Sequence, residues 1–276
     1  MKAYLECVPC IISQALRVAR LATNNPVAHR KVMEGVLKEL AETDLGCTPF
    51  ELGQIPQRVV ADITGVADPY PEIRRESNAR ALELYPRLRA IVEEADDPLH
   101  AAAKIAAAGN IIDFGAVGEG FDIEATLEGA MAKPFGVDHY AAFRQAAEAA
   151  SSVLYLADNA GEIVFDRVLI EELPVDRVIV AVRGEPFLND AMLDDADEAG
   201  ITALAEVIAA PLYPARSDEL EEAWGSVDMI ISKGQANYES YSEWDGPLFF
   251  LLIAKCDFTA KDTGVSKGDT VLLGPR

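Results

Sequence analysis

The sequence has few histidines and cysteines for its length. It contains 3 histidines and 4 cysteines in 276 residues. The histidines, His29, His100 and His139, are scattered through the first 150 residues and suggest no site built on imidazole. Four thiols in a chain of this length do not form the disulfide framework of a small secreted domain. The composition therefore argues against a histidine-based site and against a disulfide-stabilised fold.

Basic residues are also scarce relative to acidic ones. The chain carries 24 lysines and arginines against 46 aspartates and glutamates, which gives a formal net charge of −22. Such a surface repels nucleic acids and anionic membranes, so we expect neither as a partner. It would also repel a phosphate substrate unless a bound metal and local lysines reversed the field inside a cleft. The acidity could equally reflect an organism with high internal salt.

Long apolar runs and several familiar motifs are missing. The longest apolar run, 247–254, is too short to span a bilayer. Glu6, Arg17 and Arg20 interrupt the stretch where a secretory signal would need continuous apolar residues. We therefore expect a cytoplasmic protein. Because there is no G-x-S-x-G, P-loop or G-x-G-x-x-G, the common hydrolase and nucleotide-binding interpretations lose support.

The hydrophobic pattern changes near residue 150. Before this point, helical periodicity predicts helices over 9–22, 57–64, 71–92, 97–108 and 138–150. A further helix follows the first of these and ends near residue 41. After it, the strand-length runs 153–156, 178–182, 204–209, 229–231 and 248–253 alternate with the helical stretches 162–173, 191–199 and 217–224. Residues 269–273 suggest a last edge strand. We expect an all-helical region, 1–150, and a Rossmann-like three-layer α/β domain with a parallel sheet, 151–276.

Three polar clusters follow predicted strands at the points where the strands end. They are Asp158-Asn159-Ala160-Gly161-Glu162, Asn189-Asp190 and Lys233-Gly234-Gln235-Ala236-Asn237-Tyr238-Glu239. Ligands of open parallel sheets bind outside the carboxyl ends of the strands, so the clusters should converge on one crevice. Aspartate carboxylates and an asparagine carbonyl are hard oxygen ligands for a divalent cation, and nearby lysines suit a phosphate. The sequence therefore predicts a metal and phosphate site.

Each cluster also has a purely structural explanation. Asp158 or Asn159 could cap a helix, Asn189-Asp190 could open an acidic first turn, and the third cluster could be an ordinary polar loop. Gly161 favours a ligand, because glycine allows close backbone approach and a helix N-terminus follows it. Asp190 could supply a third metal oxygen at the same crevice. Lys255 follows the most apolar run, so we expect it at a strand end, where it can neutralise phosphoryl charge.

Cys7 and Cys10 lie one helical turn apart at the start of a predicted helix. Zinc sites usually have two such pairs, whereas thioredoxin-type redox motifs normally follow a strand. A metal site, a redox role and inert, partly buried thiols all remain open.

The chain resembles the metal-dependent damage-control phosphatases, formerly a domain family of unknown function. The matching segments run nearly end to end: Cys7-Val-Pro-Cys10, residues 109–115, 158–162, Arg183-Gly184 with Pro186 and Asn189-Asp190, residues 233–239, and Ala254-Lys255-Cys256-Asp257. The Cys-x-x-Cys resembles that of the small, mostly archaeal subfamily that carries this motif.

This resemblance implies a helical region packed on a Rossmann-like domain, and a divalent metal at Asp158, Asn159 and Asp190. It also implies substrate contacts from residues 233–237 and Lys255. We take Asp158, Asp190 and Lys255 as the catalytic residues. The predicted substrate-binding residues are Gly161, Glu162, Arg183, Lys233, Gly234 and Asn237.

Family activities include hydrolysis of sugar phosphates and of phosphopantetheine-type metabolites. We therefore predict a phosphomonoester hydrolase that acts on small phosphorylated metabolites with Mg²⁺, Mn²⁺, Co²⁺ or Ni²⁺. One alternative is a protein that binds a metal or phosphorylated ligand without turnover. Another is the carboxyl methyltransferase described for an animal branch of the family. That branch has Arg-Thr-x-Lys where this chain has Leu252-Ile253-Ala254-Lys255.

Overall fold

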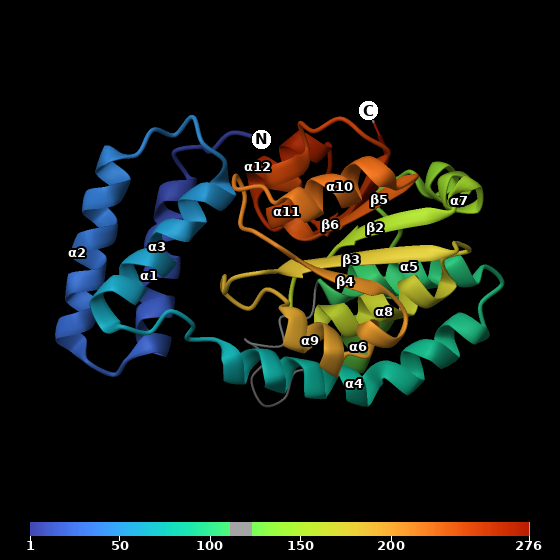
Figure 1. Ribbon diagram of the computed structural model, residues 1–276, viewed down its shortest axis with the longest axis horizontal. Coiled ribbons are helices and arrows are strands. Elements are labelled where there is room, and N and C mark those ends of the chain that lie inside the picture. The colour runs from blue at the N-terminus through green and yellow to red at the C-terminus, as the bar shows by residue number, and fades with distance from the viewer. Residues whose placement is uncertain (111–122, 276) are drawn as a thin grey trace.

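A seven-stranded sheet forms the centre of the protein, seen in a computed structural model that describes residues 1–110 and 123–275 (Figure 1). The strand order is β1-β7-β6-β5-β2-β3-β4, and every pair is parallel except β6 with β7. The strands are β1 (Val137–Asp138), β2 (Ser152–Leu156), β3 (Arg177–Arg183), β4 (Glu206–Ala210), β5 (Met229–Lys233), β6 (Leu248–Ile253) and β7 (Thr270–Leu273).

The central strands are buried along their whole length because both faces of the sheet are covered. Every residue of β5 and of β6 is buried, as is typical of parallel sheets between two helical layers. The chain runs from β2 to β3 and β4 on one side, then returns to β5 on the other side of β2. The strand order therefore reverses at β2, which is where ligands bind in open α/β sheets.

Helices cover both faces of this sheet (Figure 1). One layer contains α4 (Pro71–Glu93), α5 (Pro98–Gly109), α8 (Glu162–Glu172) and α9 (Leu193–Glu198), and the other contains α10 (Asp218–Ser226), α11 (Gly234–Tyr241) and α12 (Asp257–Thr263). Separate apolar clusters fill the two interfaces. The remaining elements of this part are α6 (Ile123–Ala132), α7 (Tyr140–Ala149) and the 3-10 helix η1 (Ile201–Ala203). The predicted α/β class with a Rossmann-like, three-layer arrangement is confirmed.

The first three helices form a lobe of their own at the left end of the sheet in Figure 1. These are α1 (Cys7–Ala22), α2 (Pro26–Glu42) and α3 (Pro49–Thr64). The Asn25 side chain caps α2, and Thr48 forms a capping box with Glu51 at the start of α3. Their apolar faces meet in a third cluster that includes Val18, Val36, Leu52 and Val60.

The region expected to be all-helical differs from that expectation. It contains β1, which pairs with β7, so β7 is not an edge strand. Helix α5 packs on α8 instead of joining the lobe of α1–α3, and a Cβ at Gly109 would lie only 2.9 Å from Phe165 Cβ. A two-residue strand leaves no period in the sequence, and periodicity does not say which partner a helix packs on. The division into two domains at residue 150 stays a prediction.

Three α-helices were not predicted: α6, α11 and α12. Residues 233–239, expected as a polar turn, instead finish β5 and begin α11, and α12 follows Cys256. Both are short, at 8 and 7 residues, so an apolar repeat has too few turns in which to show itself.

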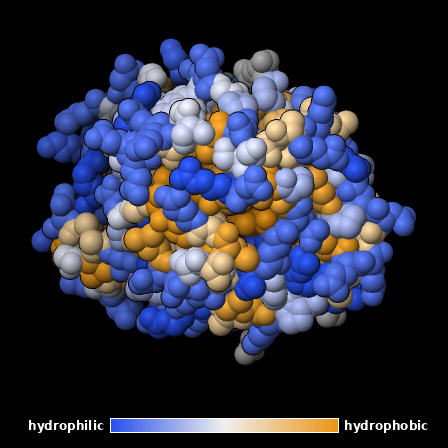
Figure 2. All heavy atoms as spheres, turned by 45° about the vertical axis from the view of Figure 1, so that its right-hand side comes forward, coloured by the Kyte–Doolittle hydropathy of each residue, from blue (hydrophilic) through white to orange (hydrophobic). Residues whose placement is uncertain are grey.

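The surface of the described residues is mixed in character. Figure 2 shows apolar residues across the middle of one face, with hydrophilic residues around them. Among residues 1–110 and 123–275, no helix is both long enough and apolar enough to cross a bilayer.

Candidate active site

The chain segments that leave β2 and β3 lie against each other at the reversal of strand order. Asn159 and Asp190 form an isolated β-bridge. The N–H of Ala191 donates to the carbonyl of Asp158 over 2.8 Å, and the N–H of Ala160 donates to that of Asn189 over 2.9 Å. The backbone therefore brings the first two predicted clusters together beyond the strand ends.

Three side-chain oxygens at this point accept no hydrogen bond from a described residue, and we call them the open oxygens. Asp158 Oδ2 accepts hydrogen bonds from Asn110 Nδ2 (2.9 Å) and Asn159 Nδ2 (2.7 Å), and Asp190 Oδ2 accepts one from Arg183 Nε (2.7 Å). Within the described parts of the chain, no hydrogen bond engages Oδ1 of Asp158, Asn159 or Asp190. All three residues line one cavity of about 560 Å³. Two carboxylate oxygens and an amide oxygen fit a hard divalent cation.

Electrostatics also favour a cation here. Burial raises the pKa of Asp158 to about 8, and the nearby charges of Glu162 and Asp190 add to this. Burial likewise raises the pKa of Asp190, although Arg183 opposes the shift. With its pKa at about 8, the Asp158 carboxyl is largely protonated at pH 7, and a divalent cation would replace that proton and offset the repulsion. No three His, Cys, Asp or Glu side chains gather as a metal site in residues 1–110 and 123–275, so a cation held here would need the amide oxygen of Asn159 beside the two carboxylates.

Gly234 lies directly against Asp158. Its φ is +78°, and a Cβ there would come within 2.0 Å of Asp158 Oδ2. Glycine is thus required both by the backbone conformation and by the space that the carboxylate occupies. Gly234 acts by leaving room for Asp158 at the start of α11.

Lys233 precedes Gly234 in the chain but does not line the cavity of about 560 Å³. Its side chain is fully buried, and Nζ donates to Ala106 O (2.9 Å), Glu162 Oε1 (2.7 Å) and Asp166 Oδ1. These three acceptors use all the donors of the ammonium group. The structure therefore gives no support for the predicted contact of Lys233 with a substrate, because its hydrogen bonds hold α8 instead.

Glu162 links Lys233 to the open oxygens. Its Oε2 accepts from Asn110 Nδ2 over 2.7 Å, and the same amide donates to Asp158. Burial alone would raise the pKa of Glu162, but Lys233 and Lys255 outweigh it and lower the pKa. Glu162 is therefore a buried carboxylate that fixes Asn110, and through it Asp158.

Arg183, Asn237 and Gly161, also predicted to bind substrate, are held within the protein. Arg183 donates to Asp190 and, over 3.0 Å, to Asn237 Oδ1. Asn237 Nδ2 in turn donates to the carbonyls of Ala157 and Lys233, each over 2.9 Å. The N–H of Gly161 donates to Asn78 Oδ1 over 2.7 Å. These contacts orient the polar segments, and direct substrate binding by the three residues stays a prediction.

Lys255 is the predicted cation that does face open space. Its side chain is exposed, and its backbone N–H is held by Gln235 Oε1 over 2.8 Å. It lines the large cavity and also a polar one of about 70 Å³, which Asn110, Asn159 and Glu162 share. Lys255 makes no ion pair with any residue of 1–110 or 123–275. Its ammonium group is therefore available to an anion beside Asn159.

A family model described as the damage-control phosphatase ARMT1-like domain matches residues 3–271, nearly the whole chain. The chain belongs to this family. The resemblance seen in the sequence is thereby confirmed, while assignment to the Cys-x-x-Cys subfamily stays a prediction.

Known relatives of this damage-control phosphatase family member match it over their full lengths. A damage-control phosphatase of Archaeoglobus fulgidus is 31% identical over 98% of this chain and 98% of its own. One of Pyrococcus horikoshii is 31% identical over 99% of this chain and 98% of its own. A crystal structure of a DUF89 family protein of P. horikoshii gives a TM-score of 0.91 at 30% identity, covering 100% of both chains. The similarity thus includes the helical lobe as well as the sheet.

Several positioning residues of this family member were not predicted from the sequence. Asn110 belongs to the matching segment 109–115, whose motif predicts no role for it, and residues 111–115 lie outside the described residues. Asn78, in the middle of α4, donates to Asp195 Oδ1 (2.8 Å) as well as accepting from Gly161. A lone polar residue within a charged helix gives no sequence signal that it is buried.

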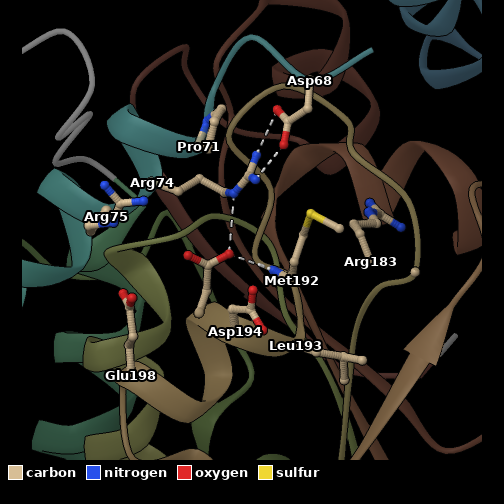
Figure 3. Close-up of a pocket in the computed structure, with 11 residues that line it drawn as sticks. Asp68, Pro71, Arg74, Arg75, Arg183, Met192, Leu193, Asp194 and Glu198 are labelled. Carbon is tan, nitrogen blue, oxygen red and sulfur yellow. Dashed lines mark hydrogen bonds and ion pairs between the residues drawn. The ribbon is translucent and has the colours of Figure 1, made fainter.

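A second cavity, of about 450 Å³, is lined by residues that include Arg74, Arg183 and Glu198 (Figure 3). Arg74 points into it, but its guanidinium is held by Asp68 Oδ2 at 2.6 Å and by Asp195 Oδ2 at 3.3 Å. Figure 3 shows the Arg74 guanidinium facing the Asp68 carboxylate. Asp195 also accepts a hydrogen bond from Asn78, and Asn78 accepts one from the N–H of Gly161. The ion-pair network therefore stabilises the turn at Gly161 through Asn78.

Cys7 and Cys10 line the same cavity as Asp158 and Asp190. One face of helix α1 forms part of the cavity wall, with Cys7, Cys10, Ile11, Gln14 and Arg17. The pair is thus close to the candidate site, although none of the interactions that position Asp158 or Asp190 involves a thiol.

Replacing both Cys7 and Cys10 by serine should leave metal-dependent turnover within about tenfold, a change worth about 1.4 kcal/mol in the barrier. The reason is that the chemistry expected of the open oxygens and of Lys255 involves no thiol group. Steady-state phosphate release by the folded double variant measures this. A loss of several orders of magnitude would place the thiols in the catalytic machinery.

Proposed function

We propose that this protein is a divalent-metal-dependent phosphatase that hydrolyses phosphomonoesters of small metabolites. Family membership supports phosphatase activity. The observation that supports the proposal is that Asp158, Asn159 and Asp190, each with an open oxygen, line one cavity together with Lys255.

In this proposal Asp158, Asn159 and Asp190 hold the metal, which would polarise a phosphoryl oxygen and neutralise its charge. Lys255 pairs with another phosphoryl oxygen and offsets negative charge as the bond to the leaving group breaks. Asn110 and Arg183 keep the carboxylates of Asp158 and Asp190 in place through hydrogen bonds of 2.9 and 2.7 Å. Positions fixed in advance reduce the reorganisation needed during the reaction.

The two cavities suggest how a substrate would lie. Asn159 and Lys255 line both the 70 Å³ cavity and the 560 Å³ cavity. A phosphoryl group at their junction would reach the open oxygens, and the larger cavity would take the organic part. Its walls include Ile11, Gln14 and Glu239, so both apolar and hydroxylated groups find partners there.

A metal and substrate panel tests this function. Sugar phosphates, 4′-phosphopantetheine and p-nitrophenyl phosphate are assayed with Mg²⁺, Mn²⁺, Co²⁺ and Ni²⁺, with EDTA as control. We expect phosphate release from at least one ester, falling to background in EDTA and returning with excess cation.

Other outcomes would contradict the proposal. Equal rates of phosphate release with and without EDTA would show that the reaction does not need a metal. Thermal stabilisation by a phosphorylated ligand with no release of phosphate by any metal would indicate a binding protein. Binding of S-adenosylmethionine with transfer of its methyl group would indicate a methyltransferase.

A further inference from the structure

Three of the four cysteines line the proposed active-site cavity. These are Cys7, Cys10 and Cys256, whereas Cys47 is not among the residues that line it. Cys256 follows Lys255 directly, and its Sγ lies 3.6 Å from Gln235 Nε2. The chain thus places most of its thiols around the cavity, and the phosphatase chemistry proposed above uses none of them.

The two thiols of α1 differ in access. Cys10 is exposed, and its Sγ makes no hydrogen bond with any described residue. Cys7 is half-buried, its Sγ accepts from the N–H of Tyr4 over 3.5 Å, and burial raises the pKa of its thiol. Since reaction with a disulfide depends on the thiolate and on access, Cys10 should react first.

We propose that Cys10 is a thiol-modification site in the wall of the active-site cavity, with Cys7 as its resolving thiol. Low-molecular-weight disulfides would reversibly inhibit the enzyme by attaching a group to Cys10, and Cys7 would displace that group. The inhibitory effect rests on the proposed phosphatase function, whereas the site itself does not.

The chemistry is two successive thiol–disulfide exchanges. The Cys10 thiolate attacks a disulfide R–S–S–R, which forms the Cys10–S–R bond and releases RS⁻; this anion takes up the proton lost by Cys10. The Cys7 thiolate then attacks the Cys10 sulfur, forming the Cys7–Cys10 disulfide and releasing a second RSH. Two electrons pass from the protein to R–S–S–R, and reductant reverses both steps.

The start of α1 can accommodate the second step. Side chains at i and i+3 of a helix have Cβ atoms about 5–6 Å apart, whereas a disulfide needs about 3.5–4.5 Å. The first turn must therefore tighten. Cys7 is the first residue of α1, and its N-cap residue, Glu6, makes no side-chain capping hydrogen bond. An uncapped first turn is less firmly held than an interior turn, so the movement needed is local.

A group attached to Cys10 would occupy space that the substrate needs. Cys10 shares the cavity of about 560 Å³ with Asp158 and Lys255. An adduct in this wall would exclude the organic part of a substrate while leaving the metal-binding oxygens unmodified. Inhibition should therefore be relieved by reductant and not by added metal.

The test uses the full-length, metal-loaded protein and cystamine, with intact-mass and peptide mass spectrometry beside a phosphate-release assay. In Cys7→Ser the mixed disulfide on Cys10 cannot resolve, so it should accumulate and lower turnover at least tenfold until dithiothreitol is added. The wild type should go on to form the Cys7–Cys10 disulfide, which carries no adduct, and should therefore regain most of its turnover. Cys10→Ser should resist inhibition, and Cys47→Ser, the matched control outside the cavity, should behave as the wild type.

Persistent inhibition of Cys10→Ser, modification at Cys47 ahead of Cys10, or full activity of the Cys10 adduct would overturn the proposal. Mass spectrometry also separates its failure from failure of the phosphatase function. Inorganic phosphate with Mn²⁺ should slow Cys10 modification whether or not a substrate has been found. Modification at an unchanged rate with phosphate and Mn²⁺ present would show that Cys10 does not share their site.

Discussion

Asp158→Ala should lower metal-dependent phosphate release about 1,000-fold or more, as expected when a group central to a catalytic unit is removed. The substitution removes one of the three open oxygens and the buried carboxylate on which Asn110 and Asn159 converge. The loss should be in turnover, because the other residues of the site remain in place. Initial rates over a range of substrate and Mn²⁺ concentrations measure it.

The control is Asp194→Ala, which removes an exposed aspartate from the first turn of α9. It should keep wild-type turnover. Circular dichroism should show that Asp158→Ala is folded, and Mn²⁺ should raise the melting temperature of the wild type but not of this variant, since only a protein that binds the cation is stabilised by it. A folded, fully active Asp158→Ala variant would show that Asp158 is not needed for catalysis.

Lys233→Met should destabilise the protein by about 3–5 kcal/mol, because it breaks a buried ion cluster from one side. Lys233 has no exposed surface, and its ammonium lies between Glu162 and Asp166. Methionine fills much of the same volume but leaves the buried carboxyl groups of Glu162 and Asp166 without their ammonium partner. Burial already raises the pKa of Asp166 to about 7 with the lysine present. Urea unfolding at pH 7.5 measures the change.

Lys261→Met, on the exposed surface of α12, is the matched control and should change the free energy of unfolding by less than about 0.5 kcal/mol. Adding Asp166→Asn to Lys233→Met should recover part of the lost stability, since it removes a buried acidic group that has lost its ammonium partner. A change below about 1 kcal/mol for Lys233→Met alone would mean that the carboxylates are protonated or hydrated without the lysine.

Much of the fold was readable from the sequence because the sheet is buried on both faces. Buried parallel strands appear as short apolar runs, and the polar residues at their ends then indicate the crevice. The meeting of Asp158-Asn159 with Asp190 follows from this logic. The short helices α11 and α12 and the two-residue β1 did not, since none contains enough turns or residues to produce a period.

The different positions of Lys233 and Lys255 could not be read in the same way. Both follow apolar strands, and both were predicted to contact phosphate. Burial separates them: Lys233 is enclosed by Glu162 and Asp166 of α8, while Lys255 is exposed. The spacing of these two acids, i and i+4 on one helix face, was the available signal, because buried carboxylates on an apolar helix need a cation.

The contribution of α1 to the cavity was also hidden. Its cysteines and Gln14 meet residues near Asp158 only after the lobe of α1–α3 is placed beside the sheet. No local pattern encodes that placement, since it depends on packing between segments more than 100 residues apart in the chain.

Anomalous diffraction from crystals grown with Mn²⁺ and inorganic phosphate would test the central claim most directly. We expect one strong peak bonded to Oδ1 of Asp158, Asn159 and Asp190, with the phosphate between that peak and the Lys255 ammonium. A strong peak elsewhere, such as among Cys7, Cys10 and Cys256, with none beside Asp158, would contradict the account.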